Sequence, residues 1–352
     1  MLTNKKVVVT GGTGSLGHAL VRRLLSGACG TPRQITVFSR DEAKQHAMRL
    51  TYHRRNAATD EVIYHNFERV LRFQIGDVRD YHSVCAVLRD ADVVVNAAAL
   101  KQVPTCEYFP FEAVQTNIGG AANTVRAIRE HRLPVETVVG VSTDKACKPV
   151  NVMGMTKAVQ ERIFIQAQLE CPHTRFACVR YGNVLATRGS VVPLFQEQIR
   201  NGGPVTITTT AMTRFLLSLD QAVDTIVGAL REAYGGEIYI PRLPSARVVE
   251  LAEVLIGDRP IETRITGIRP GEKVHELLVS EEEAHRTITR GDYYVITPML
   301  PELHLPMHDA PTQDGEYNSG HDVMDKSELE ALLRQQRLLV EDYARQAEAV
   351  LL

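Results

Sequence analysis

The chain has 352 residues, of which 44% are hydrophobic and 23% are charged, and its formal net charge is -2. This balance provides no overall field that would attract nucleic acid or an anionic membrane surface, so we expect a small-molecule partner. The N-terminus shows no apolar signal segment, no run of about 18 apolar residues occurs, and the six cysteines form no C-x-x-C pair, which predicts a cytoplasmic protein with reduced thiols.

Short apolar runs rich in β-branched residues alternate with helical patterns through the first half of the chain. The runs are Val7–Val9, Ile35–Phe38, Leu71–Gln74, Val93–Val95, Val138–Val141 and Phe176–Val179. Runs that are apolar on both faces and separated by helices indicate a parallel sheet covered on two sides. The predicted fold class is α/β, a doubly wound parallel Rossmann sheet with a smaller C-terminal substrate-binding region.

A glycine-rich turn lies between the first predicted strand and the first predicted helix. Glycines at 11, 14 and 17 allow a sharp turn and direct the amides of a helix N-terminus toward a pyrophosphate. The strand, turn and helix in sequence predict a nicotinamide dinucleotide cofactor. The expected contacts are Gly11, Thr13, Gly14, Ser15, Leu16 and Gly17.

The second predicted strand ends where an acidic residue usually takes the ribose 2′-hydroxyl of NAD. This chain has Ser39 and Arg40 there, with Lys44 one turn later. A hydroxyl and cations suit a 2′-phosphate, because a guanidinium pairs with phosphate oxygens, so NADP is favoured over NAD. Asp41 could still reach a ribose hydroxyl. Further cofactor contacts are expected after the third and fourth strands, at Asp77, Val78, Ala97, Ala98 and Ala99.

The regular alternation breaks after Arg180. We therefore assign residues 1–186 to an NADP-binding Rossmann domain, to which residues 211–237 return with a predicted helix at Leu219–Ala233. Residues 187–210 and 238–298 are predicted to form the smaller cap over the carboxyl edge of the sheet. That edge is where ligands bind in open α/β sheets.

Residues 299–352 are predicted to form a C-terminal connection and a helix. The polar segment Pro301–Tyr317 indicates an exposed connection, and the apolar spacing in Ser327–Leu352 indicates a helix. This helix suggests contacts in a homo-oligomer, although it could equally fold back on its own subunit.

Two stretches are the most specific in the chain: Asn96–Pro104 reads NAAALKQVP and Ser142–Lys145 reads STDK. They are accompanied by Thr10–Gly17, Phe38–Glu42, Thr116-Asn117, Asn151–Lys157, Arg180–Val184 and Arg269–Lys273. Together, over roughly residues 5–290, the chain resembles the extended short-chain dehydrogenase/reductase superfamily and, within it, the UDP-N-acetylglucosamine 4,6-dehydratases of bacterial polysaccharide biosynthesis. The resemblance implies further cofactor contacts from Lys101, Asn117 and Lys157, and relatives that form dimers and hexamers.

The resemblance also implies a reaction. Hydride moves from sugar C4 to the cofactor and returns to C6, while C5 loses a proton and the C6 hydroxyl leaves as water; the proton transfers need acids and bases beside the nicotinamide. By this resemblance Thr143 would bond the 4-hydroxyl, Asp144 would protonate the leaving C6 oxygen, and Lys145 would take the C5 proton. The alternative is that Asp144 and Lys145 form a solvated turn pair.

The superfamily's Tyr-x-x-x-Lys pair is Met153-x-x-x-Lys157 in this chain. The spacing keeps both residues on one helical face, but a thioether cannot transfer a proton. A C5-inverting, capsule-type branch of the dehydratases is similar in carrying methionine there. The base for the 4-hydroxyl stays open among Asp144, Lys145, Lys101 and a water, and Met153 could instead be core packing in a non-catalytic homologue. Lys157 is expected to hold the nicotinamide ribose.

A nucleotide-sugar substrate brings a diphosphate and a uracil, so the cap should supply cations and amides. Arginine suits the diphosphate and glutamate suits a ribose hydroxyl. The candidates are Lys101, Asn183, Arg188, Ser190, Val191, Arg214, Arg269 and Glu272. The twelve histidines lack metal-ligand spacing, and we expect no metal.

Three functions remain: a UDP-N-acetylglucosamine 4,6-dehydratase, a nucleotide-sugar 4-epimerase, and a non-catalytic NADP-binding protein. An epimerase needs no carboxylic acid and second base after the threonine, so Asp144 and Lys145 favour the dehydratase.

Overall fold

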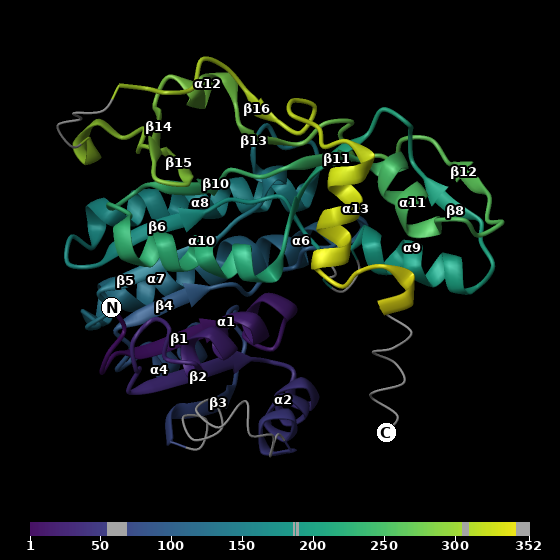
Figure 1. Cartoon of the computed structure of the whole chain (residues 1–352). Helices are drawn as coiled ribbons and strands as arrows, with labels where there is room; N and C mark the ends of the chain where they lie inside the picture. The colour runs from purple at the N-terminus through teal and green to yellow at the C-terminus, as the bar shows by residue number, and fades with distance from the viewer. Residues whose placement is uncertain (55–68, 186, 188–189, 305–309, 343–352) are drawn as a thin grey trace.

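The predicted apolar runs form strands of one large sheet in the computed structural model, which describes residues 1–54, 69–185, 187, 190–304 and 310–342. Across these residues the sheet has nine strands in the order β14-β15-β10-β6-β5-β4-β1-β2-β3 (Figure 1). The strands are β1 (Lys6–Thr10), β2 (Gln34–Ser39), β3 (Leu71–Ile75), β4 (Val93–Asn96), β5 (Thr137–Val141), β6 (Arg175–Val179), β10 (Ile238–Pro241), β14 (Thr287–Arg290) and β15 (Tyr293–Ile296). The pairs from β3 through β10 are parallel, and the order 3-2-1-4-5-6 is that of the doubly wound Rossmann fold, as predicted.

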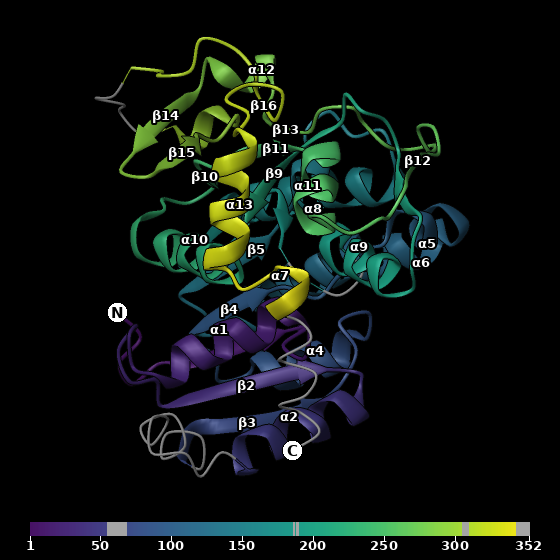
Figure 2. The same ribbon diagram turned by 45° about the vertical axis from the view of Figure 1, so that its right-hand side comes forward.

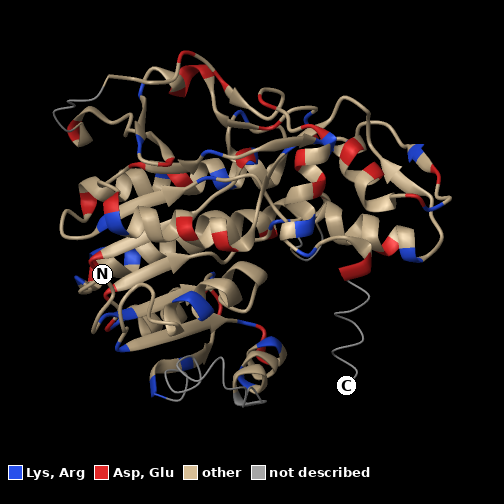
Figure 3. Ribbon diagram, in the orientation of Figure 1, with Lys and Arg blue, Asp and Glu red and all other residues tan. Residues whose placement is uncertain are grey.

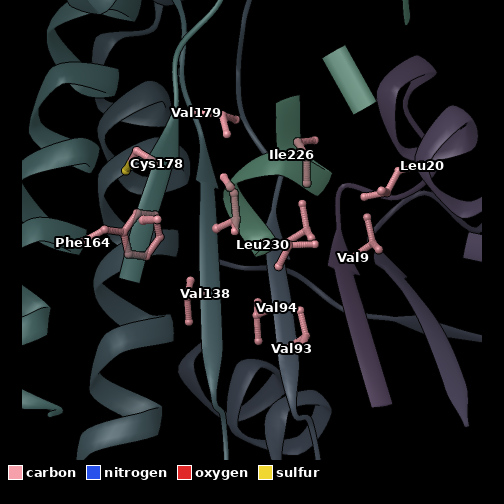
Figure 4. Close-up of a cluster of buried hydrophobic side chains, with 14 of the residues drawn as sticks. Val9, Leu20, Val93, Val94, Val138, Phe164, Cys178, Val179, Ile226 and Leu230 are labelled. Carbon is pink, nitrogen blue, oxygen red and sulfur yellow. The ribbon is translucent and has the colours of Figure 1, made fainter. Parts of the chain in front are cut away.

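Helices cover both faces of the sheet, which explains why its central strands are apolar throughout. On one face α1 (Ser15–Leu25) packs beside α10 (Leu219–Glu232), and on the other α4 (Tyr81–Leu88), α7 (Gly120–His131) and α8 (Val152–Glu170) pack in a row. Beside β2 lies α2 (Glu42–Arg54). Figure 4 shows the core between these layers, with Leu20, Ile226 and Leu230 from α1 and α10 on one side and Phe164 from α8 on the other. The helix predicted at Leu219–Ala233 is confirmed as α10.

A second hydrophobic core lies beyond the carboxyl edge of the sheet. It is built by α9 (Val191–Arg200), β8 (Val205–Ile207), α11 (Val248–Ile256) and α13 (Lys326–Gln335), and the exposed strand β12 (Thr263–Ile265) pairs with β8. The small sheet β11-β9-β7, of β7 (Asn183–Val184), β9 (Thr213–Leu217) and β11 (Ser245–Arg247), joins it to the Rossmann part. Helix α9 and strand β8 thus belong to the smaller unit.

The predicted boundary at residue 238 is wrong. Strand β10 is buried along its whole length and adds to the parallel sheet beside β6, and the β14–β15 hairpin continues the same sheet in antiparallel pairing. Conversely, β9 lies within 211–237 yet pairs outside the Rossmann sheet with β7 and β11. Which sheet each of these short strands joins depends on pairing with strands far away in the sequence. A local apolar pattern does not encode that pairing.

The end of the predicted C-terminal connection pairs with an earlier strand. Strand β16 (Tyr317–Asn318) pairs with β13 (Leu277–Val279), and the Tyr317 hydroxyl donates to Leu243 O (3.0 Å) and accepts from Leu243 N (2.8 Å). The helix predicted at Ser327–Leu352 is interrupted: α13 ends at Gln335, and a turn follows in which Arg337 has a φ of +53°. Helix α13 packs against α11 (Figure 2). Its Leu329 and Leu333 are fully buried within this subunit, so the predicted apolar face is covered by the chain itself.

Charged side chains of both signs are spread over the elements visible in Figure 3, in keeping with the near-neutral net charge. Within the described ranges, none of the helices combines the length and the apolar composition needed to cross a bilayer.

Candidate functional site

The glycine turn has the shape that a dinucleotide requires. Gly11 has a φ of +66°, and a Cβ at this position would lie 2.8 Å from the Ala98 backbone. A Cβ at Gly17 would lie 2.4 Å from Gly12 O, so α1 can approach β1 closely only with glycine there. At Gly14 the nearest described atom to such a Cβ is Gly11 O at 3.4 Å, so this side of the turn is open. An open second glycine is what a pyrophosphate needs, and the residues present fit a dinucleotide.

The residues predicted to distinguish NADP from NAD lie at the end of β2. Thr13 Oγ1 donates to Ser39 Oγ at 3.2 Å, which ties the glycine turn to this strand. The Arg40 guanidinium lies 3.7 Å from the Asp77 carboxylate, and Lys44 Nζ lies 2.6 Å from Asp41. Both cations stand at the predicted place, but each is already paired with an aspartate.

Gln45 was missed from the sequence because it looks like an ordinary polar residue of a surface helix. It is buried, and its Nε2 donates to Ser39 O (2.9 Å), to Ser39 Oγ (3.2 Å) and to Gln74 O (2.9 Å). Gln45 therefore fixes the ends of β2 and β3 beside each other.

The loop after β4 is held from two sides. Thr10 Oγ1 donates to Asn96 Oδ1 (3.0 Å) and accepts from Ala98 N (3.2 Å). Asn117 lies in a π-helix, η2 (Val114–Gly119), a structure frequent at functional sites. Its side chain accepts from Leu100 N (2.8 Å) and donates to Leu100 O (3.0 Å) and Thr156 Oγ1 (2.9 Å). The structure thus gives Asn117 a role in shaping the loop.

Other predicted contacts of this loop differ in exposure. Lys101 and Ala99 are exposed, Ala97 and Ala98 are half-buried, and Val78 is buried in the core. A Cβ at Gly120 would lie 2.9 Å from Val78 Cγ2, so the Val78 side chain packs against α7.

The acid and the lysine after β5 form the centre of the candidate site. They lie on a short 3-10 helix, η3 (Asp144–Ala146), which Thr143 caps. Thr143 Oγ1 donates to Asp144 Oδ1 (2.8 Å), and Lys145 Nζ donates to the same oxygen (3.0 Å). Asp144 is fully buried, and its Oδ2 has no hydrogen-bond partner among the described residues. The alternative interpretation, in which Asp144 and Lys145 form a solvated pair on a turn, is therefore wrong, because Asp144 is buried.

Glu276 completes this cluster and was missed from the sequence. Its Oε1 lies 3.2 Å from Lys145 Nζ, the residue is 2% exposed, and no described residue bonds its Oε2. The guanidinium of Arg214 lies 3.8 Å from Glu276 and donates to Thr213 O (2.7 Å) and Val274 O (3.2 Å). The only sign of Glu276 in the sequence is its position. It comes directly before the apolar strand β13 and three residues after the Arg269–Lys273 motif.

The charged groups of this cluster, Asp144, Lys145 and Glu276, shift one another's pKa values. Burial, with the nearby Glu276 carboxylate, raises the pKa of Asp144 against the opposing charge of Lys145. Burial alone would lower the pKa of Lys145, but the Asp144 and Glu276 carboxylates outweigh it and raise that pKa. Burial alone would raise the pKa of Glu276, but Lys145 and Arg214 lower it. In the resting site the lysine is therefore an ammonium held between two acids.

Helix α8 presents Met153 and Lys157 as predicted, on one face. Met153 is buried in a small cluster with Cys106 and Ala113, so its side chain acts in packing. Lys157 Nζ donates to Val141 O (2.5 Å) and to Gln160 Oε1 (2.6 Å), and burial lowers its pKa to about 8.

The remaining residues predicted to contact the substrate lie at several places in the structure. Asn183 Oδ1 and Ser190 Oγ are buried and find no hydrogen-bond partner in the part of the chain that is described; since buried polar atoms are normally bonded, both fit a polar ligand. Val191 follows Ser190 as the first residue of α9. Arg269 and Glu272 lie on a turn, where Glu272 accepts from the Arg269 backbone (3.3 Å). Arg188 lies outside the described residues.

A separate cavity of about 1170 Å³ lies between α8 and the β14–β15 hairpin and contains none of the predicted site residues. The cations in its wall are largely paired: Arg180 with Glu161 and Glu283, and Arg290 with Glu237. The described residues contain no group of three or more histidine, cysteine or acidic side chains arranged to hold a metal.

Comparisons with known proteins extend over most of the chain. Residues 7–298 match the family model described as polysaccharide biosynthesis protein. A UDP-N-acetylglucosamine 4,6-dehydratase (inverting) of Campylobacter jejuni subsp. jejuni is 40% identical over 303 residues, 85% of each chain. A UDP-glucose 4-epimerase of Rickettsia conorii is 42% identical over 301 residues, 84% of each chain. The X-ray structure of Pen from Bacillus thuringiensis has a TM-score of 0.86 and 32% identity, covering 96% of this chain and 100% of that one.

Proposed function

Because the chain belongs to the polysaccharide biosynthesis protein family, within the extended short-chain dehydrogenase/reductases, we propose that it is an NADP-dependent UDP-N-acetylglucosamine 4,6-dehydratase that inverts C5. The observation that carries this proposal is the buried Asp144, whose Oδ2 lacks a partner among the described residues, beside Lys145. Both reactions need a group for the 4-hydroxyl proton, but only a 4,6-dehydratase also needs an acid for the C6 oxygen and a base for C5. The inverting relative supports the stereochemical part.

The glycine turn, Ser39, Arg40 and Lys157 would hold the dinucleotide. When bound, its nicotinamide supplies a reversible hydride acceptor for sugar C4 and C6. The pairing of Arg40 with Asp77 leaves the guanidinium within reach of a phosphate that could replace the aspartate. Titration of the protein with NADP and with NAD tests this preference for NADP.

Asp144 can serve two proton transfers in turn. Met153 cannot take the proton of the 4-hydroxyl, and the Thr143 hydroxyl already donates to Asp144 Oδ1. The 4-hydroxyl proton would therefore pass through Thr143 to the Asp144 carboxylate, and Asp144 would return it to the leaving C6 oxygen. A pKa raised by burial suits a group that must both accept and donate near neutral pH.

One incubation tests the proposal. Purified protein is given UDP-N-acetylglucosamine in deuterated water, and the products are followed by NMR and mass spectrometry. The dehydratase predicts a 4-keto-6-deoxy product with deuterium at C5. Asp144→Asn should abolish it, and Glu281→Gln, an exposed acid on α12 (Glu281–Ala284), should not.

The relatives named UDP-glucose 4-epimerase make epimerisation the second candidate. It predicts UDP-N-acetylgalactosamine from the same incubation, or UDP-galactose from UDP-glucose, with no exchange at C5. Bound cofactor without any turnover of either sugar would indicate a non-catalytic homologue.

A further inference from the structure

We propose that Glu276 is the positioning residue that accepts a proton from Lys145 and thereby lets this lysine act as the base at C5. The inference rests on the proposed dehydratase function and adds to it a group from a distant part of the chain. Glu276 lies 131 residues after Lys145, and its Oε1 is 3.2 Å from Lys145 Nζ.

The need for such a group follows from the site itself. The C5 base must have a free lone pair, and an ammonium has none. Lys145 lies between the carboxylates of Asp144 and Glu276, an arrangement that favours the ammonium over the free amine. Asp144 accepts a hydrogen bond from Thr143 and, in the proposed mechanism, carries the protons of the two sugar hydroxyls. Glu276 is then the other carboxylate in contact with Lys145 Nζ that can accept its proton.

The cations around Glu276 lower its pKa and hold it as a carboxylate at rest, the form that can accept a proton. Arg214 lies 3.8 Å away, and the Lys273 ammonium, which also lowers the pKa of Glu276, donates to Cys147 O (2.6 Å). His275, the neighbour in sequence, has its Nδ1 2.8 Å from Thr213 Oγ1. Arg214 keeps the carboxylate ionised at rest and remains beside it when it is neutral.

The backbone of Glu276 is fixed by the C-terminal connection. Its amide donates to Ser319 Oγ (2.9 Å), and Ser319, fully buried, also contacts Thr213 Oγ1 (2.8 Å). The pairing of β13 with β16 brings Ser319 to this place. The segment after residue 310 therefore helps to build the site.

The proton transfer balances within the pair. The N–H bond of the Lys145 ammonium breaks, an O–H bond forms at Glu276 Oε1, and both charges disappear. The freed lone pair on Nζ then takes the C5 proton and restores the ammonium. A neutral pair is favoured over an ion pair when bound substrate displaces water, because a low dielectric penalises separated charges. When the proton is returned to carbon from Lys145, Glu276 gives back its own.

The first test is the pH dependence of turnover in Glu276→Gln, with Glu276→Asp as the conservative variant and Glu281→Gln as the exposed control. In the unmodified protein the proton moves inside the pair, so kcat should change less than threefold from pH 7 to 9. In Glu276→Gln the lysine must release its proton to solvent, so kcat should fall at least 100-fold at pH 7 and rise about tenfold per pH unit. Glu276→Asp should keep the flat profile. A merely structural loss would lower kcat by the same factor at every pH, and parallel profiles would overturn the proposal.

The second test needs no turnover, so it separates a failure of this inference from a failure of the proposed function. The cofactor-loaded protein, without sugar, is treated with acetic anhydride, and acetylation of Lys145 is followed by mass spectrometry. Removing one of the two carboxylates that hold the ammonium should make Lys145 at least fivefold more reactive at pH 9 to 10 in Glu276→Gln, and Glu281→Gln should leave it unchanged. Equal reactivity in Glu276→Gln and the unmodified protein would refute the coupling, whatever product the enzyme makes.

Discussion

The second and third glycines of the cofactor turn, Gly14 and Gly17, should respond differently to alanine. At Gly17 the new Cβ would lie 2.4 Å from Gly12 O, and ordinary contact begins at 3.4 Å, so backbone must move by about 1 Å. Such overpacking costs about 1–3 kcal/mol. With an unfolding entropy of about 2.1 cal/mol/K per residue, the cost corresponds to a fall in Tm of about 1–4 °C for a chain of this length.

At Gly14 the same change meets only Gly11 O, at the 3.4 Å contact limit among described atoms. Gly14 has φ of -79° and ψ of 169°, which alanine adopts freely, so the expected cost is about 0.5 kcal/mol from the weaker N-cap. The new methyl would instead occupy the open side of the turn, and dinucleotide affinity should fall at least about tenfold, or 1.4 kcal/mol.

The assay is thermal unfolding of cofactor-free protein, so that bound ligand does not add to the measured stability, together with titration of NADP. Gly14→Ala should keep its Tm within about 1 °C and lose cofactor; Gly17→Ala should lose both. A Gly14→Ala protein that binds NADP as tightly as the unmodified one would refute the placement of the pyrophosphate. Equal losses of stability would refute the steric reasoning.

Three further changes test other parts of the molecule. Lys145→Ala should abolish product and leave bound cofactor unchanged, as measured by NMR of the product and by absorbance of the released dinucleotide. Arg40→Ala should weaken NADP by about 10–100-fold and NAD by less than about threefold in parallel titrations, because only the former loses a charged hydrogen bond. Arg180→Leu removes five hydrogen bonds to buried partners and strands Glu161 and Glu283, at a cost of about 3–5 kcal/mol in thermal unfolding. Burial opposes ionisation of Glu283, but Arg180 lowers its pKa to about 2, so this stability is present above about pH 4.5 and is lost as the pH falls toward 2; a deficit that did not shrink in acid would contradict the pairing.

The sequence was sufficient wherever the signal is local. Each of the six runs became a parallel strand of the sheet. The inner strands are apolar because helices cover both faces of the sheet, whereas the edge strand β3 is partly exposed and carries Arg72 and Gln74. The glycine turn and the Thr143–Lys145 segment were found because their chemistry depends on adjacent residues. Gly17 in particular is required by its distance to Gly12, five residues earlier.

The sequence was insufficient wherever the signal is a contact between distant segments. Glu276 reads as a surface charge until β13 brings it to Lys145, and Gln45 reads as a solvent-facing helix residue until its amide is seen between β2 and β3. Arg214 suggested a diphosphate ligand, and the structure places it beside Glu276 and two backbone carbonyls. A polar residue buried by a distant partner has no periodicity of its own to reveal it.

The methionine on α8 shows how the site divides its tasks. Met153 packs with Cys106 and Ala113, and on the same helix Lys157 is bonded to Val141 O, so α8 offers shape and one lysine of lowered pKa. The carboxylates of Asp144 and Glu276, each with a second oxygen that no described residue bonds, lie instead around Lys145, at the carboxyl end of β5. In this chain the cluster of Asp144, Lys145 and Glu276 lies on the loop after β5, against strand β13 from the C-terminal half. Because Met153 cannot transfer a proton, the proposed mechanism assigns the proton transfers to Asp144, Lys145 and Glu276.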